Sequence, residues 1–232
     1  MTTWAAKGLF EPVVTTRWPD VAEPARGVTP GRPIAAGGAA ARCPTGALEP
    51  GSDDVRMDRC VHCVRCQRGT DAPAQWRDDY AWSRFAPTKT PLPAAFARSI
   101  HVRVIDAGDC GACLAELLQL PSPNYSLHRL GIFLTPTPRQ ADVLLIVGPV
   151  SSAMRAALLA AYEAMPEPKR VVAVGACAAS GGLFGPSFIC GAGAADVVPV
   201  DMVVPGCPPP PLAILDALLK LMGRPSATEV AP

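Results

Sequence analysis

The stretch Ala141-Asp-Val-Leu-Leu-Ile-Val-Gly-Pro-Val150 is almost continuously apolar and predicts one β-strand, over 142–147. Continuous apolar runs of this length are typical of parallel strands that are buried on both faces. Further strand patterns occur at 100–106, 132–135 and 170–174, and another at 197–204, where Pro199 suggests a strand followed by an irregular extended segment. Helical patterns lie between them, at 113–120, 152–165 and 212–222. Because strands and helices alternate, we expect an α/β fold with a parallel sheet covered by helices.

Composition divides the rest of the chain into distinct segments. Residues 1–42 are rich in Pro, Gly, Ala and Arg and predict an extended N-terminal arm. Residues 43–70 hold four cysteines in a short polar stretch, and residues 71–99 form an aromatic and proline-rich linker. Its aromatic side chains are expected to pack on the main domain, which we place at 100–225. The small, polar residues 226–232 predict a flexible tail.

Charge and cysteine content narrow the functional class. The chain has 232 residues with 21 basic and 20 acidic side chains, so it lacks the basic excess that nucleic-acid binding requires. No apolar run reaches the roughly 18–20 residues of a membrane span, and no Sec signal pattern is visible at the N-terminus. We therefore expect a cytoplasmic protein. Its nine cysteines then favour metal or redox chemistry over disulfides.

The first cysteine group reads Cys60-Val-His-Cys63-Val-Arg-Cys66, with Cys43-Pro44 upstream. This segment resembles a bacterial ferredoxin, in which a C-x2-C-x2-C run and a distant Cys-Pro share one cluster. The resemblance implies a small N-terminal α+β ferredoxin-like module that holds one [4Fe–4S] cluster on Cys43, Cys60, Cys63 and Cys66. A second cluster would need cysteines at four positions that hold other residues, namely Pro33, Ala36, Ala39 and Thr70. The alternative is a four-cysteine zinc site, although zinc motifs usually come as two C-x2-C pairs. His62 is expected to face solvent.

The second cysteine group follows the predicted strands of the main domain. Cys110 and Cys113 come after the strand at 100–106, Cys177 after 170–174, and Cys207 after 197–204. In open parallel sheets, ligands bind outside the carboxyl ends of the strands. Three separate strands would therefore deliver four thiolates to one edge of the sheet. Glycines beside these cysteines would let the backbone approach a bound cluster and direct N–H groups at its sulfurs.

The motifs around these cysteines carry a more specific resemblance. Asp-Cys110-Gly-Ala-Cys113, Val-Gly-Ala-Cys177 and Val-Pro-Gly-Cys207-Pro-Pro-Pro are similar to the small subunit of [NiFe] hydrogenases of the energy-converting and formate-hydrogenlyase type. They are also similar to the homologous cluster-bearing subunit of NADH:quinone oxidoreductase. The resemblance covers roughly residues 99–223 and implies a flavodoxin-like domain that holds a [4Fe–4S] cluster on these four cysteines. The quinone enzymes have two adjacent cysteines at the first position, so the C-x2-C here favours the hydrogenase branch.

The resemblance implies an electron-transfer subunit with two [4Fe–4S] clusters, part of an oxidoreductase but not catalytic alone. Its partners would be a hydrogenase-like large subunit, another iron–sulfur subunit and membrane subunits, in a peripheral arm on the cytoplasmic face of the inner membrane. A nickel-free subunit that donates electrons to quinone is one alternative, and a zinc-stapled structural adaptor is another. No phosphate-loop or dinucleotide motif follows a strand, so we expect no flavin, NAD or nucleotide site.

Two further residues are singled out by position. Glu116 lies one helical turn beyond Cys113, so both are expected on the same helix face. In the family that the chain resembles, a glutamate here lies near the large subunit and is a candidate proton relay; the alternative is an ordinary exposed helix residue. Cys190 fits neither cysteine group, and we expect it to be a buried apolar cysteine.

Overall fold

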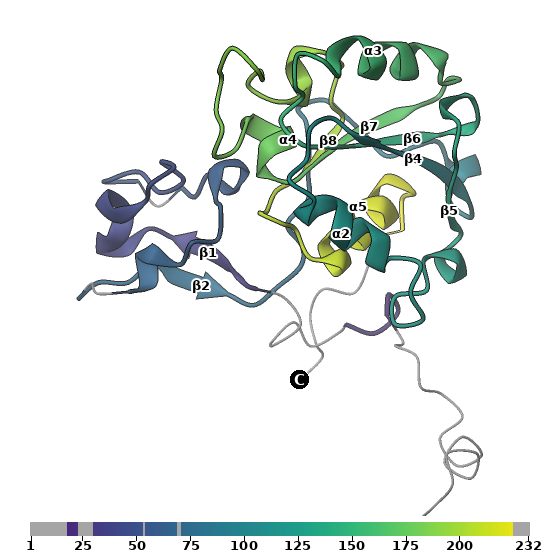
Figure 1. Ribbon diagram of the computed structural model, residues 1–232. Coiled ribbons are helices and arrows are strands. Elements are labelled where there is room, and N and C mark those ends of the chain that lie inside the picture. Colours follow the sequence, from purple (N-terminus) through teal and green to yellow (C-terminus); the bar gives the residue numbers. More distant parts are fainter. Residues whose placement is uncertain (1–17, 23–29, 53, 69–70, 225–232) are drawn as a thin grey trace, which may run out of the picture.

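The computed structural model describes residues 18–22, 30–52, 54–68 and 71–224 (Figure 1). The predicted tail at 226–232 and most of the predicted arm lie outside these ranges. The strands are β1 (Arg32–Ala35), β2 (Gln75–Arg77), β3 (Arg84–Phe85), β4 (Ile100–Asp106), β5 (Ile132–Leu134), β6 (Val143–Val147), β7 (Arg170–Val174) and β8 (Met202–Val204). The α-helices are α2 (Ala112–Gln119), α3 (Arg155–Ala164), α4 (Ala176–Ser180) and α5 (Pro211–Leu221).

The main domain is built on a sheet in which, over the described residues, six strands follow the order β3-β8-β7-β6-β4-β5. The strands β4 to β8 are parallel, whereas β3 pairs antiparallel with β8 at one edge. Counted along the chain, the parallel strands lie in the order 2-1-3-4-5, which is the flavodoxin order. The predicted flavodoxin-like parallel sheet is therefore confirmed.

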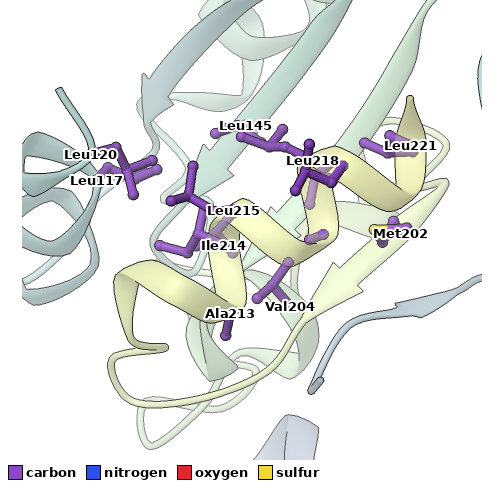
Figure 2. Packing of buried hydrophobic residues seen from close by; sticks show 14 of the residues in the cluster. Leu117, Leu120, Leu145, Met202, Val204, Ala213, Ile214, Leu215, Leu218 and Leu221 are labelled. Carbon is purple, nitrogen blue, oxygen red and sulfur yellow. The ribbon is translucent and has the colours of Figure 1, made fainter. Parts of the chain in front are cut away.

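Helices cover both faces of this sheet. On one face, α2 and α5 pack against β4, β6, β7 and β8, and Figure 2 shows the leucines of α5 between the sheet and Leu117 and Leu120. The α5 sequence is apolar nearly all round, as expected of a helix with little contact with water. On the other face, Leu158 of α3 and Ala178 of α4 pack against Leu144 and Ala173. This two-sided cover keeps the carboxyl ends of the strands at one common edge.

The ferredoxin-like module includes residues on both sides of the predicted 43–70 segment. β1 pairs antiparallel with β2, which closes the module around short 3-10 turns at Gly37–Arg42, Met57–Arg59 and Arg65–Gln67. Its own core is small and consists largely of alanine side chains with Leu48 and Cys66. Parts of the predicted arm and of the predicted linker therefore belong to this unit, because the cysteine loops alone offer too little apolar surface to bury.

The linker is packed tightly against the main domain. Tyr80 and Trp82 are almost fully buried in the main core, and Trp18 donates an indole hydrogen bond to the Tyr80 hydroxyl over 3.1 Å. Ser83 bonds to the fully buried Asp216 of α5, which also pairs with Lys220 over 2.7 Å. The expectation that the linker aromatics pack on the main domain holds for these residues.

Two local predictions differ from the structure. The segment 197–204 was expected to begin as a strand, but the strand β8 forms only at its end, after the irregular stretch around Pro199. Proline removes a donor from the ladder, so pairing with β7 starts beyond it. The short helix α4, with the sequence Ala-Cys-Ala-Ala-Ser, was not predicted because five residues give no periodicity. No helix in the described ranges combines the length and apolarity needed to cross a bilayer.

Candidate iron–sulfur sites

The second cysteine group gathers at the carboxyl edge of the main sheet. Cys110 lies in the loop after β4, and Cys113 lies in the first turn of α2. Cys177 lies in the first turn of α4, directly after β7, and Cys207 follows β8. Cys113 is buried, Cys177 and Cys207 are half-buried, and Cys110 is exposed. The strands thus bring these four cysteines to one edge, with one thiol deep and one at the surface.

Electrostatic interactions show that these four thiols lie close together. Burial raises the pKa of the Cys113 thiol, and negative charge on Asp109 and the other three cysteines raises it further. Burial likewise raises the pKa of Cys177 to about 11, with further contributions from Cys207 and Cys110. Thiolates so placed repel one another, so a bound cation would be needed to keep them all deprotonated.

Glycines leave room next to two of these sulfurs. A Cβ added to Gly175 would lie 2.5 Å from the Cys113 Sγ, and one added to Gly182 would lie 2.7 Å from the Cys177 Sγ. Both glycines have positive φ, at +90° and +57°, a backbone conformation that side chains disfavour. The donor set and the space beside it therefore fit an iron–sulfur cluster on Cys110, Cys113, Cys177 and Cys207.

Asp109 shapes this site although the sequence analysis did not single it out. Its carboxylate accepts hydrogen bonds from the backbone N–H groups of Gly111 and Leu114, each over 3.0 Å. These bonds satisfy donors at the start of α2 and so fix the helix turn that carries Cys113. The available signal was an aspartate just before a helical pattern, which is typical of a helix start.

The first cysteine group lines a single pocket in the ferredoxin-like module. Its wall includes all four predicted cysteines together with Pro33, Val61 and Trp76. Cys60 and Cys66 are buried, Cys43 is half-buried and Cys63 is exposed. The Trp76 indole N–H is buried and has no hydrogen-bond partner among the described residues. An unpartnered buried donor is costly, so this pocket fits a ligand that offers an acceptor, such as a cluster sulfide.

The thiols of this pocket also interact with one another. Burial raises the pKa of Cys60 to about 11, and charges on Cys43, Cys66 and Cys63 raise it further, although a backbone hydrogen bond at His62 opposes them. Burial would also raise the pKa of Cys43, but hydrogen bonds around Thr45, Ala47 and Leu48 outweigh it and lower the pKa below its ordinary value. The Ala47 N–H lies 3.2 Å from the Cys43 Sγ. Cys43 is therefore prepared to act as a thiolate ligand.

Alanines occupy positions where a second ferredoxin cluster would need ligands. Ala36 and Ala39 are buried in the small core of the module, in contact with the layer that includes Cys66. Pro33 lines the pocket of the first cysteine group instead. Thr70 lies outside the described residues. The space beside this pocket is thus filled by apolar side chains.

His62 does not face solvent, contrary to the prediction. It lies between the two cysteine groups, stacked on Trp82 with ring centroids 5.2 Å apart. Its Nδ1 atom lies 3.4 Å from the backbone nitrogen of Cys207. The expected exposure was wrong because the linker folds back over the cysteine loop and buries the ring, a contact that spacing along the chain cannot show.

Glu116 and Cys190 occupy different surroundings. Glu116 is half-buried on α2, where burial raises the pKa of its carboxyl group, and its charge raises the pKa of Tyr125. Cys190 is buried, and its Sγ lies 3.3 Å from the Ser187 hydroxyl and 3.4 Å from the Gly185 carbonyl oxygen. In the described ranges, no group of three or more His, Cys, Asp or Glu side chains is arranged to hold a single metal ion.

Comparisons with known proteins follow the same division of the chain. The family model of the NADH ubiquinone oxidoreductase 20 kDa subunit matches residues 110–221. The uncharacterized protein MJ0516 of Methanocaldococcus jannaschii is 47% identical over 124 residues, which cover 53% of this chain and 83% of that protein. Formate hydrogenlyase subunit 7 of Escherichia coli is 39% identical over 138 residues, which cover 60% of this chain and 54% of that subunit.

A solved structure extends the likeness to the fold. A chain of the membrane-bound sulfane sulfur reductase, an archaeal respiratory membrane complex, is 32% identical with a TM-score of 0.50. The match covers 57% of this chain and 75% of that chain. Because MJ0516 is matched over most of its length at high identity, the chain belongs to the family of the 20 kDa subunit of NADH:ubiquinone oxidoreductase.

Proposed function

We propose that this protein is the electron-transfer small subunit of a [NiFe] hydrogenase-type complex and holds two [4Fe–4S] clusters. One cluster would be bound by Cys43, Cys60, Cys63 and Cys66, and the other by Cys110, Cys113, Cys177 and Cys207. The observation that carries the proposal is that two separate groups of four thiols each interact electrostatically as a group. Tetrathiolate sets of this kind are the usual ligands of [4Fe–4S] clusters.

The two sites would form a relay within one chain. When bound, such clusters supply one-electron redox chemistry. The chain itself contributes the thiolates, the backbone N–H groups near them and the apolar walls that keep water away. The second site would exchange electrons with a large subunit, and the ferredoxin-like site with another iron–sulfur subunit.

An apolar surface beside the second site supports a permanent partner there. Leu183, Phe184, Phe188 and Ile189 are all more than half exposed, in the loop that follows α4 and projects beside it in Figure 1. Phe184 and Ile189 also line a cavity of about 300 Å³ that reaches Gly108. Exposed apolar groups of this kind mark interfaces, so this loop is the candidate contact with the large subunit.

The partner decides the reaction. The C-x2-C at Cys110 and Cys113 and the likeness to formate hydrogenlyase subunit 7 favour a large subunit with a [NiFe] centre for H2 oxidation or proton reduction. The name of the matching family instead favours a nickel-free complex whose cluster donates to quinone. The sequence of the co-purifying large subunit separates the two, because a nickel site needs two C-x2-C pairs. In both cases the proposed location is a peripheral arm on the cytoplasmic face of the membrane.

Metal analysis of anaerobically purified protein tests the proposal directly. About eight irons and eight acid-labile sulfides per chain are expected from two [4Fe–4S] clusters. Cys63→Ser should lower the iron content by about half, whereas Cys190→Ser, outside both groups, should leave it unchanged. Zinc in place of iron, or a full iron content in Cys63→Ser, would contradict the assignment.

The proposed proton relay through Glu116 has its own test. Glu116→Gln keeps the shape of the side chain but removes the exchangeable proton, so hydrogen turnover should fall by about 10²-fold or more with both clusters retained. Glu163→Gln, on the exposed surface of α3 on the opposite side of the sheet, is the matched control and should leave turnover unchanged. Wild-type turnover in an intact Glu116→Gln complex would exclude this residue from the mechanism.

A further inference from the structure

His62 connects the two cysteine groups through a pair of hydrogen bonds. Its Nδ1 lies 3.4 Å from the backbone nitrogen of Cys207, and its Nε2 lies 3.2 Å from the carbonyl oxygen of Gly31. A backbone N–H can only donate and a carbonyl oxygen can only accept. Both bonds therefore require one state of the ring, the neutral tautomer with its proton on Nε2. Burial lowers the pKa of His62, which is consistent with this neutral state.

The ring is also clamped from both sides. Trp82 stacks on it with an interplanar angle of 13°, and Trp76 meets it edge-on with ring centroids 6.1 Å apart. Trp82 is itself fixed by hydrogen bonds from its indole N–H to Asp79. It also packs against the loop of Cys207, since a Cβ added to Gly206 would lie 3.0 Å from the Trp82 ring. The same indole thus contacts both His62 and the loop that His62 bonds.

The backbone of His62 is held in an unfavourable conformation. Its φ is +50°, in the left-handed region that costs a residue with a side chain about 1–2 kcal/mol. Such strain persists only where surrounding contacts over-determine it. Here those contacts are the ring stack and the two hydrogen bonds, and they direct the imidazole away from its own loop and toward Cys207.

We infer that His62 is a positioning residue that fixes the loop of Cys207 against the loop of Cys60 and Cys63. The imidazole belongs to the first cysteine loop by sequence and bonds to a residue of the second group by its Nδ1. One side chain therefore sets the separation of the two groups, on which electron transfer between them would depend. The inference deepens the proposed function and rests on it for the role of the two cysteine groups.

Hydrogen exchange at the Cys207 amide tests the inference. Pro205 and Pro208–Pro211 have no amide hydrogen, so a peptide covering 205–212 carries backbone amides only at Gly206, Cys207 and Leu212. Exchange of this peptide, followed by mass spectrometry on the anaerobically purified protein, therefore reports on Cys207 with little background. The iron content is measured on the same samples.

The variants separate the Nδ1 acceptor from the rest of the ring. His62→Phe keeps the aromatic stack and removes both hydrogen bonds, so exchange at Cys207 should rise about 2- to 10-fold. His62→Gln can still reach Gly31 but has no acceptor at the Nδ1 position, so it should behave like His62→Phe. His62→Asn places its Oδ1 where Nδ1 was and tolerates the left-handed backbone, so it should restore slow exchange.

Each outcome decides the matter. Slow exchange in His62→Asn and fast exchange in the Phe and Gln variants support the positioning role. Wild-type exchange in the Phe and Gln variants, or fast exchange in His62→Asn, would overturn it. An iron content at or below half of the expected value in the wild-type protein would instead contradict the proposed function, and it would be seen before any variant is compared.

Discussion

The two cysteine groups are held in contrasting ways. The first lies within residues 43–66 on short 3-10 turns, above a core made mostly of alanines. The second is spread over residues 110–207 and is brought together by the ends of β4, β7 and β8. One group is therefore positioned by the local chain and the other by the whole sheet. The comparison shows that equivalent thiolate sets can be built on scaffolds with very different amounts of buried apolar surface.

This difference places the stability of the molecule mainly in one region. The two large apolar clusters centre on the sheet of the main domain, and one of them extends to Ala47, Met57 and Cys60 of the ferredoxin-like module. The Ser180 hydroxyl of α4 also donates a hydrogen bond to the Asp58 carbonyl oxygen over 2.6 Å. The module therefore leans on the main domain, which Figure 1 shows beside it at α4. We expect the module to depend on its partner region more than the reverse.

The largest expected effect comes from where the chain is cut between the two regions. A variant that begins at Asp78 keeps Tyr80, Trp82 and Leu92, all buried in the main core, and keeps β3 on the sheet. A variant that begins at Ile100 loses them, and burial of each such side chain contributes about 1.5–3 kcal/mol. The longer variant should fold and hold about four irons, whereas the shorter should lose about 5 kcal/mol or more in the free energy of unfolding.

Denaturant titration and iron analysis of the two truncated proteins check this prediction. The variant beginning at Asp78 is the matched control, because it lacks the ferredoxin-like cysteines just as the shorter one does. Equal midpoints for the two proteins would mean that the linker aromatics add nothing to the main core. Loss of all iron from the longer protein would mean that the second group depends on the first.

An intermediate effect is expected from closing the space beside Cys177. Gly182→Ala would place a methyl group 2.7 Å from the Cys177 Sγ, so iron content should fall by about half with the first cluster retained. Gly185→Ala is the matched control, since its φ of +56° nearly equals the +57° of Gly182 but nothing lies within 4 Å of the added carbon. It should cost about 1–2 kcal/mol of stability with iron unchanged. Equal iron loss in both variants would point to backbone strain alone.

The smallest expected effect concerns the unpartnered indole in the first pocket. Trp76→Phe keeps an aromatic ring and removes the N–H, so the reduction potential of the first cluster should fall by about 20–60 mV if that N–H donates to a sulfide. A hydrogen bond to sulfur stabilises the more negative reduced state, which sets this sign. Trp18→Phe removes an indole that bonds to Tyr80 instead and is the control. A potentiometric titration that finds no difference between them would leave Trp76 as a packing residue.

Sequence reasoning was most successful where the signal was continuous along the chain. The strands β6 and β7 were predicted to within one residue because each is a run of apolar, β-branched-rich sequence between turn residues. The helices α2 and α5 were located equally well from their periodicity. The order of the parallel strands then followed from the resemblance to a known family rather than from any residue pattern.

The remaining features depend on contacts between distant residues. β3 has two residues and exists only because it pairs with β8. The boundaries of the ferredoxin-like module were drawn too narrowly because β1 and β2 are three or four residues long and stabilise only each other. The burial of His62 depends on Trp82 and Cys207, which lie far along the chain. None of these leaves a periodic trace in the sequence.

The spread of the second cysteine group has a consequence for how the protein is made. On the ribosome, the chain acquires Cys43, Cys60, Cys63 and Cys66 early and close together. The sheet, however, cannot bring Cys110 and Cys113 to Cys207 until β8 has been synthesised and has paired with β7. A nascent chain that contains β4 to β7 therefore presents three of the four thiols without a completed site. Cofactor insertion can accompany translation at the first group, but at the second it must wait for the last strand.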